Sequence, residues 1–144
     1  MTRIERLDPV VQHVDKKQEK ALQEVAFSQG QVSTEQHRLD QLMVYRDDYL
    51  KNKTQLQQAC SAIELQEYSR FLVQLDDTIK KQMEVIRLRE SELNMKRRAW
   101  QATRINANVM HKVVENLEQQ NLLQEERREQ KSMDEFAQRK AHHR

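Results

Sequence analysis

The chain has 144 residues and a net charge of +2, with 33% charged residues, 5% aromatic residues, one Gly and one Pro. Ordinary globular domains contain about 7% Gly and 5% Pro, so this composition argues against a compact mixed fold with many turns. Disordered chains typically have high net charge and frequent Pro, Gly and Ser, which argues against disorder throughout. The composition instead favours long helices that carry an apolar stripe.

The sequence also indicates the compartment. No apolar run approaches the roughly 18 residues of a transmembrane helix, and the N-terminal MTRIERLDPV lacks the apolar core of a signal peptide. The single cysteine, Cys60, cannot form an internal disulfide, which fits a reducing compartment. We expect a cytoplasmic protein without direct membrane insertion.

A first helix is predicted over residues 8–57. Asp8 suits the N-cap and Pro9 the first helical position. Gly30 is a candidate for local bending, although a tolerated Gly is the favoured interpretation, at a cost of about 1 kcal/mol relative to Ala. The heptad seam of this helix consists of Val11, Val14, Gln18, Ala21, Val25, Ser28, Val32, Glu35, Leu39, Leu42, Arg46, Tyr49, Lys53 and Leu56.

A second seam begins at Leu72 and predicts a paired helix over 71–117. Its two rows are Leu72, Ile79, Ile86, Leu93, Trp100, Ala107 and Val114, and Leu75, Gln82, Arg89, Lys96, Thr103, Met110 and Leu117. A repeat of seven held this long implies a left-handed supercoil. The two seams cannot be joined in phase, so the chain is predicted to reverse in a connecting turn over 58–70.

An antiparallel hairpin pairs residues whose numbers add up to a constant. A sum of 128 places Leu56 opposite Leu72, and the bulky Trp100 opposite the small Ser28, as close packing requires. Sums of 121 or 135 would lose this match but remain alternatives. With a sum of 128, Glu35 lies one layer from Lys96, and such a pair would help fix the register. Other charged seam residues are expected to lay their stems along the groove with their heads in water.

Beyond Leu117, polar residues occupy the seam positions, which predicts a C-terminal helical extension and tail over 118–144. Met133, Phe136 and Ala137 form a small apolar face there, which indicates either a partner or fraying. The predicted fold class is all-α: one domain over 1–144, a long antiparallel two-helix coiled coil, or α-hairpin, with a single-helix C-terminal overhang.

Several classes of function are disfavoured. One Gly cannot build a phosphate-binding loop, and no Cys and His spacing suits zinc. A rod offers no concave pocket for an acid and a base, so no catalytic, cofactor or metal residue is predicted and the protein is not expected to be an enzyme. The basic residues Lys96, Arg97, Arg98 and Arg104 could touch phosphate, but acidic residues are spread through the chain, which gives no basic face for nucleic acid.

A patch of apolar and aromatic residues is predicted near the turn. The residues of the second helix recur at i, i+4, i+7 and i+11, which places them on one face. Such a patch is either a docking site, or a place where Phe71 and Tyr68 cap the end of the coiled coil, and both interpretations stay open. We call the following seven residues the predicted patch: Phe71, Leu75, Thr78, Gln82, Leu42, Tyr45 and Tyr49.

Three stretches resemble the FliJ family of bacterial flagellar export proteins: LMVYRDDYL at 42–50, YSRFLVQLDDTI at 68–79 and KSMDEFAQRKA at 131–141. The resemblance covers nearly the whole chain. It implies a non-enzymatic protein similar to the central stalk of rotary ATPases. The resemblance also implies a cytoplasmic location, with peripheral association with the inner-membrane export apparatus. The implied partners are the export ATPase hexamer, the cytoplasmic domain of the export-gate membrane protein, and export chaperones.

The resemblance also assigns residues. The predicted patch corresponds to the family's gate-binding surface, although Thr78 and Gln82 stand where the family pattern is closer to Ala and His, and Arg38 where it has Gln. Met133, Phe136 and Arg139 are implied to contact the ATPase or chaperones. A monomer is expected, with a domain-swapped dimer, a homodimeric scaffold and a chaperone adaptor without ATPase coupling as alternatives.

Overall fold

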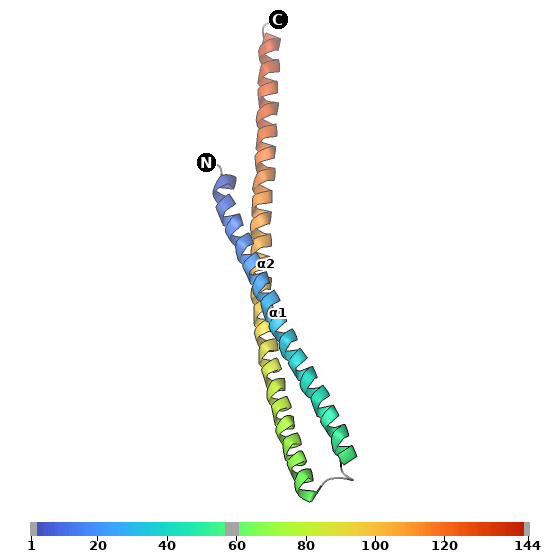
Figure 1. Cartoon of the computed structure of the whole chain (residues 1–144). Coiled ribbons are helices and arrows are strands. Elements are labelled where there is room, and N and C mark those ends of the chain that lie inside the picture. The colour runs from blue at the N-terminus through green and yellow to red at the C-terminus, as the bar shows by residue number, and fades with distance from the viewer. Residues whose placement is uncertain (1–2, 57–60, 143–144) are drawn as a thin grey trace. The chain divides into compact units, whose positions relative to one another are not determined.

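The structure is a computed structural model that describes residues 3–56 and 61–142. Two helices, α1 (Arg3–Leu56) and α2 (Ala62–His142), form an all-α hairpin, and the described residues contain no strand (Figure 1). The fold class is therefore as predicted. The chain divides into two compact units: Ala21–Trp100, here called the loop unit, and Met1–Lys20 with Gln101–Arg144, here called the terminal unit.

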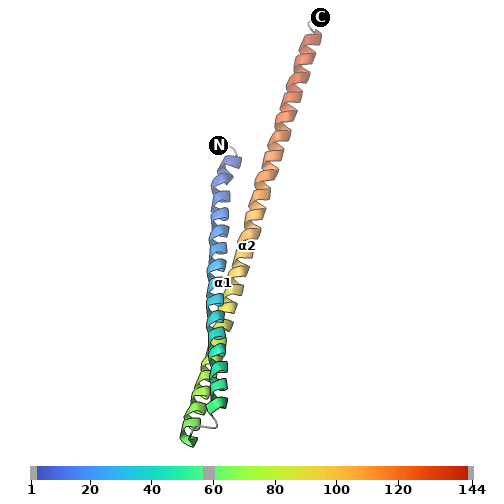
Figure 2. The ribbon, with the colours of Figure 1, turned by 45° about the vertical axis from the view of Figure 1, so that its right-hand side comes forward.

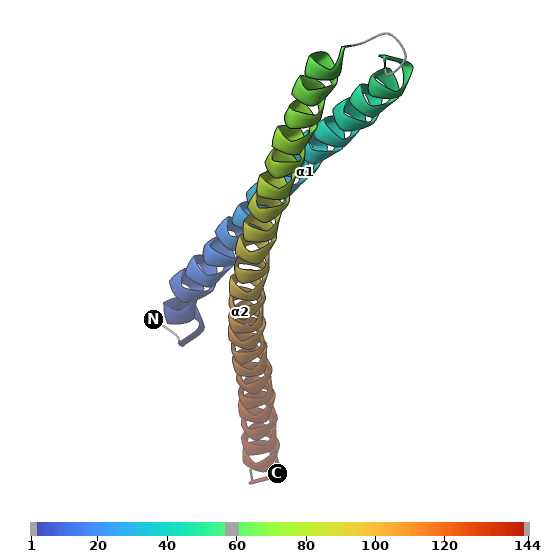
Figure 3. The ribbon, with the colours of Figure 1, turned by 90° about the horizontal axis from the view of Figure 1, so that it is seen from below.

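The heptad seam accounts for the burial in the loop unit. Every predicted seam position of α1 from 21 to 53 is buried or half-buried, and so is every one of α2 from 72 to 100 except Lys96. Figure 3 shows the ends of α1 and α2 that lie next to the connection. The apolar core of this unit consists of Val32, Leu39, Leu72, Leu75, Ile79, Ile86 and Leu93.

In the terminal unit the seam reaches further towards the N-terminus than predicted. α1 begins at Arg3, so the prediction of a start at residue 8, with Asp8 as N-cap, is wrong, and Pro9 lies inside the helix. Ile4 and Leu7 continue the two heptad rows and are half-buried. The burial of these two side chains offsets the loss of the backbone hydrogen bond that Pro9 cannot donate.

α2 also begins earlier than predicted, because residues 62–70 are helical and not part of a turn. The Ser61 hydroxyl accepts a hydrogen bond from the Glu64 backbone N–H at 3.3 Å, as an N-cap does. Leu65 and Tyr68 lie seven residues before Leu72 and Leu75 and are half-buried in the seam. Residues 57–60 and the side chain of Leu56 lie outside the described residues, and so does the predicted Leu56–Leu72 pair.

The register with a sum of 128 is wrong in the loop unit. Gln82 Nε2 donates to the Glu35 carbonyl oxygen at 2.9 Å, and 82 and 35 add up to 117. With a sum of 128, residue 93 would stand opposite Glu35, and Gln82 would lie 11 residues away, or about 16 Å along the helix. No glutamine side chain spans that distance. The contacts agree with the alternative sum of 121, which places Trp100 opposite Ala21 instead of Ser28.

The register also changes the partners of the charged seam residues. Lys96 Nζ lies 3.3 Å from the Glu24 carboxylate, so the expected approach of Lys96 to Glu35 is wrong. The guanidinium group of Arg46 was expected to lie in water, but its Nε donates to Asp76 Oδ1 at 2.6 Å. The shift by one heptad follows from the early start of α2, which adds Leu65 and Tyr68 to the seam.

In the terminal unit, α2 continues as a single helix to His142, past the N-terminal end of α1 (Figure 2). Ala107 is completely buried, whereas all residues from 118 to 142 are exposed. Ile4 lines a shallow groove with Leu122, so α1 reaches the base of this exposed segment. Among the described residues, no helix combines the length and the apolar character that crossing a membrane requires.

Candidate docking site

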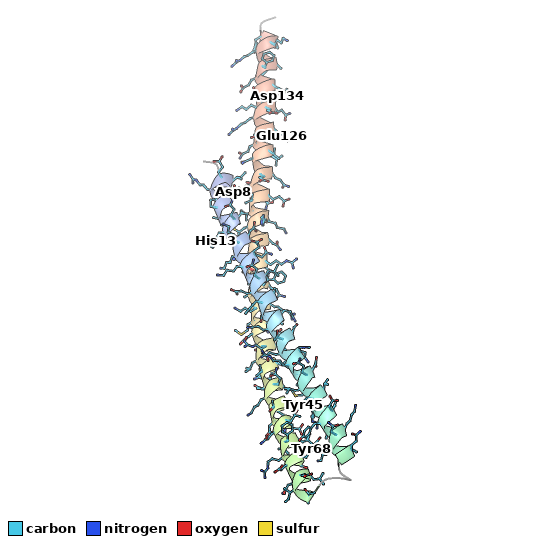
Figure 4. The ribbon with its side chains drawn as sticks, in the orientation of Figure 1. Asp8, His13, Tyr45, Tyr68, Glu126 and Asp134 are labelled. Carbon is cyan, nitrogen blue, oxygen red and sulfur yellow. The ribbon has the colours of Figure 1, made fainter. Side chains whose placement is uncertain are left out.

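Four aromatic side chains gather in the loop unit, two from each helix; Figure 4 labels Tyr45 on α1 and Tyr68 on α2. The rings of Tyr49 and Tyr68 stack with centroids 3.9 Å apart, and Phe71 lies 4.7 Å from Tyr49. Tyr45 meets Phe71 edge to face at 6.3 Å. These are favourable aromatic geometries. We call Tyr45, Tyr49, Tyr68 and Phe71 the aromatic cluster.

The inner half of the aromatic cluster closes the seam. Tyr49 and Tyr68 are half-buried, and the Tyr68 hydroxyl donates to the Tyr49 carbonyl oxygen at 2.8 Å. Burial, together with the nearby hydroxyls of Tyr68 and Tyr45, raises the pKa of Tyr49 above its ordinary value. The interpretation as a cap of the coiled coil therefore fits Tyr68, whereas Phe71, the other residue of that interpretation, stays exposed.

The outer half of the aromatic cluster is accessible. Tyr45 is 52% exposed and Phe71 36%, although Phe71 touches two other rings. An aromatic ring that is held in place by neighbouring rings and still offers surface is suited to binding a protein partner. Tyr45 and Phe71 thus form the accessible part of the site.

The other members of the predicted patch divide between core and surface. Leu75 is only 7% exposed and belongs to the core, against which Leu42 packs. Thr78 is exposed, and its hydroxyl donates to the Gln74 carbonyl oxygen at 3.0 Å. The structure therefore brings together the three rings of the predicted patch and places Leu75 and Leu42 in and against the core, whereas Thr78 bonds within its own helix.

Gln82 is half-buried, and its amide binds Glu35. Its Nε2 donates to Glu35 Oε2 at 2.6 Å as well as to the Glu35 backbone, and Arg38 Nη1 donates to Glu35 Oε1 at 2.9 Å. The hydrogen bond from Gln82, followed by the charge and hydrogen bond of Arg38, lowers the pKa of Glu35 despite its burial. The amide nitrogen of Gln82 thus supports the seam.

Two grooves adjoin the accessible rings. One, of about 380 Å³, lies on α1 and includes Tyr45, and the other, of about 540 Å³, lies between α1 and α2 and includes Phe71. The smaller groove is lined by His37, Asp40, Gln41, Val44, Tyr45 and Asp48, and the larger by Tyr49, Lys53, Glu64, Leu65, Glu67, Tyr68 and Phe71.

Sequence reasoning named Tyr68 as a cap of the coiled coil but left it out of the predicted patch, because it assigned residues 58–70 to the turn. The signal was present, since Tyr68 lies one heptad before Leu75. It also missed Val44, an exposed apolar side chain beside Tyr45. Within the described residues, no group of three or more His, Cys, Asp or Glu side chains is arranged to hold a metal ion.

The second set of predicted contact residues lies in the terminal unit. Met133, Phe136 and Arg139 are all exposed, and Lys140 Nζ lies 5.8 Å from the centroid of the Phe136 ring. That distance is compatible with a weak cation–π interaction. These residues form an accessible surface on α2. Among the described residues of the terminal unit, no other helix lies beside α2 over 126–142.

Comparison with protein families decides the assignment. The family described as flagellar FliJ protein matches residues 3–144, which is essentially the whole chain. The chain belongs to the FliJ family. Comparisons with curated proteins and with solved structures gave no match. As a member of the FliJ family, the protein is a component of the flagellar protein export apparatus, and the family is not enzymatic.

Proposed function

We propose that this FliJ-family chain is a stalk-like coupling protein of the flagellar export apparatus. It binds the export ATPase hexamer through the terminal unit and the cytoplasmic domain of the export gate through the aromatic cluster. It also binds export chaperones, acts as a monomer, and is recruited from the cytoplasm to the inner-membrane apparatus. The observation that carries the proposal is the pair of exposed rings at Tyr45 and Phe71 in a FliJ-family chain.

The structure supports a binding role for these rings in physical terms. Large aromatic side chains dominate the binding energy of protein interfaces when they are fixed before binding, because little side-chain entropy is then lost. Tyr49 contacts both Tyr45 and Phe71, and is itself stacked on Tyr68. The accessible rings are thus supported by a second layer of rings.

The terminal unit offers a different kind of surface. Residues 126–142 present a continuous helix that is exposed on every side, with Met133 and Phe136 as apolar contacts and Arg139 as a charged one. A helix of this kind can enter a ring of subunits and contact several of them. Coupling then arises from contacts that differ between states of the ATPase, and it needs no chemistry in this chain.

The gate-binding claim is tested by Phe71→Ala, measured by calorimetric titration with the gate's cytoplasmic domain. Loss of a hot-spot aromatic should weaken binding by about tenfold or more. Val73→Ala is the matched control, because Val73 is an exposed apolar residue two positions away on α2. Circular dichroism should show unchanged helicity in both variants. Equal affinities for Phe71→Ala, Val73→Ala and the wild type would contradict the proposal.

A chaperone adaptor without ATPase coupling is the second candidate, favoured by the exposed Met133 and Phe136. Deleting residues 118–144 separates the two. If ATPase stimulation is lost while gate binding persists, the stalk is supported. If only chaperone binding is lost, the adaptor is supported. Solution mass tests the homodimeric scaffold, since a monomer has a mass of 17.3 kDa.

A further inference from the structure

The chain is acidic around the aromatic cluster, although its net charge is +2. The cluster residues lie within 40–49 on α1 and 64–77 on α2. These two stretches contain seven carboxylates and two arginines, which gives a local charge of −5. The carboxylates are Asp40, Asp47, Asp48, Glu64, Glu67, Asp76 and Asp77, and the arginines are Arg46 and Arg70.

One of the two arginines already has an acidic partner. Arg46 Nε donates to Asp76 Oδ1 at 2.6 Å across the helix pair. Lys53, which lines the larger groove, donates through Nζ to the Ser69 hydroxyl at 3.1 Å. The smaller groove holds Asp40 and Asp48 without a Lys or Arg, and the larger one holds Glu64 and Glu67 against Lys53, so each groove keeps a net negative charge.

Carboxylates line both grooves beside the exposed rings. Asp40 and Asp48 lie one turn before and one turn after Val44, which is 60% exposed, in the groove that includes Tyr45. Glu64 and Glu67 line the groove that includes Phe71. An apolar and aromatic centre with negative side chains at its edge is complementary to an apolar segment flanked by cations.

We propose that this surface docks a basic amphipathic segment, in which apolar anchors contact Val44, Tyr45 and Phe71 while flanking Lys or Arg side chains pair with Asp40 and Asp48. The inference rests on the proposed function in assigning that segment to the cytoplasmic domain of the export gate. It adds the charge of the partner segment and extends the contact surface along the outer face of α1 to Val44.

The two parts of this surface have different roles. The apolar centre provides most of the affinity, because it removes apolar area from water. The carboxylates provide attraction at a distance and discrimination against acidic segments, and their effect decreases as salt screens them. Binding should therefore be salt-sensitive even though the chain as a whole has a positive net charge.

The test measures binding of the gate's cytoplasmic domain to the double variant Asp40→Asn/Asp48→Asn at about 50 mM and about 500 mM salt. The control is Glu126→Gln/Glu129→Gln, which removes the same charge from exposed positions in the terminal unit. The first variant should lose about 3- to 10-fold in affinity at low salt and much less at high salt, while the control stays within about twofold. Equal affinities for the two double variants at low salt would overturn the proposal.

Phe71→Ala in the same titration distinguishes this inference from the proposed function. If Phe71→Ala weakens gate binding while Asp40→Asn/Asp48→Asn does not, the acidic surface is wrong and the gate-binding role stands. If neither variant changes gate binding, the role itself is wrong.

The acidic surface is then measured with a designed 18-residue amphipathic peptide of Leu and Lys, and with its Leu and Glu counterpart, on the full chain. Preferential binding of the Lys peptide that is lost in Asp40→Asn/Asp48→Asn, but kept in Glu126→Gln/Glu129→Gln, supports the docking surface. Binding that is equal in both variants, or absent, overturns it.

Discussion

The loop unit and the last part of α2 in the terminal unit are both helical, but they bury side chains very differently. In the loop unit, seven apolar residues and the polar pair Ser28 and Glu35 are buried along the seam. From 118 to 142, α2 buries none. The same kind of charged, Gly-poor sequence therefore forms a packed seam where a second helix presents a matching heptad, and a fully exposed helix where it does not.

This difference indicates which part of the chain contributes most of the free energy of folding. Helical propensity alone is marginal in water, so most helix stability in proteins comes from packing an apolar face. The loop unit has such a face on both helices. The segment 118–142 depends on local propensity and on side-chain pairs along the helix, and should open at a much lower free energy.

The largest expected effect is a cavity in the loop unit. Ile79 lies in the core with Leu39, Leu75 and Ile86. Ile79→Ala should lower the free energy of unfolding by about 2–5 kcal/mol, because it removes buried methyl groups and leaves a cavity. Met133→Ala, at an exposed position of the terminal unit, should change it by less than about 0.5 kcal/mol. Urea unfolding followed by circular dichroism measures both, and equal losses would remove the contrast between the two regions.

A smaller effect is expected at the aromatic cluster. Tyr68→Phe removes the hydrogen bond to the Tyr49 carbonyl oxygen while keeping the ring stack. The expected loss is about 0.5–1.5 kcal/mol, typical of a partly buried hydrogen bond. Tyr45→Phe is the control, since the Tyr45 ring is half exposed. If Tyr45→Phe destabilises the chain as much as Tyr68→Phe does, the hydroxyl of Tyr68 has no special role.

Gly30→Ala should stabilise the loop unit. Gly30 lies within α1, and a Cβ added there meets no atom within 4 Å. The gain should be about 0.5–1 kcal/mol, because Ala loses less backbone entropy than Gly on forming a helix. Thermal unfolding measures it. A loss of stability would mean that the glycine is needed for a bend in α1.

The smallest effect concerns the pH dependence at Glu35. Its pKa in the folded chain lies below the ordinary value of 4.5, so its carboxylate contributes stability that is fully present above that value. This contribution disappears as the pH falls through the lower folded-state pKa. Wild type should therefore lose more stability than Glu35→Gln between about pH 6 and about pH 3. Urea unfolding of both chains at each pH measures this. The free energies of unfolding of the two chains should converge as the pH falls, and a constant difference between them would contradict the prediction.

Much of the burial pattern could be predicted from the sequence, because burial in a coiled coil follows heptad position. Lys96 is the single described seam position that is exposed, and its long stem allows its ammonium group to reach Glu24. The start of α2 was also predictable, since Ser61 and Glu64 have the spacing of a capping box. The prediction of a turn over 58–70 overlooked that signal.

The register could not be derived from side-chain size. The expectation that a sum of 121 loses the size match at Trp100 is wrong, because Trp100 then stands opposite Ala21, which is as small as the Ser28 of the sum of 128. Packing alone therefore does not separate these alternatives. The contact between Gln82 and Glu35 distinguishes the two registers. Heptad rules assign both polar residues to the seam but do not predict that they bind each other. The aromatic cluster was predicted only in part for the same reason, because the stacking of Tyr68 on Tyr49 depends on the register.

The central claim is that α1 and α2 of one chain pack antiparallel in the register that stacks Tyr49 on Tyr68. Isotope-filtered NOE spectroscopy tests it directly, because the chain has three tyrosines, which Tyr→Phe variants assign. We expect strong NOEs between the Tyr49 and Tyr68 rings within one chain. NOEs from Tyr49 to Ile79 in their place, or ring contacts that appear only between differently labelled chains, would contradict the account.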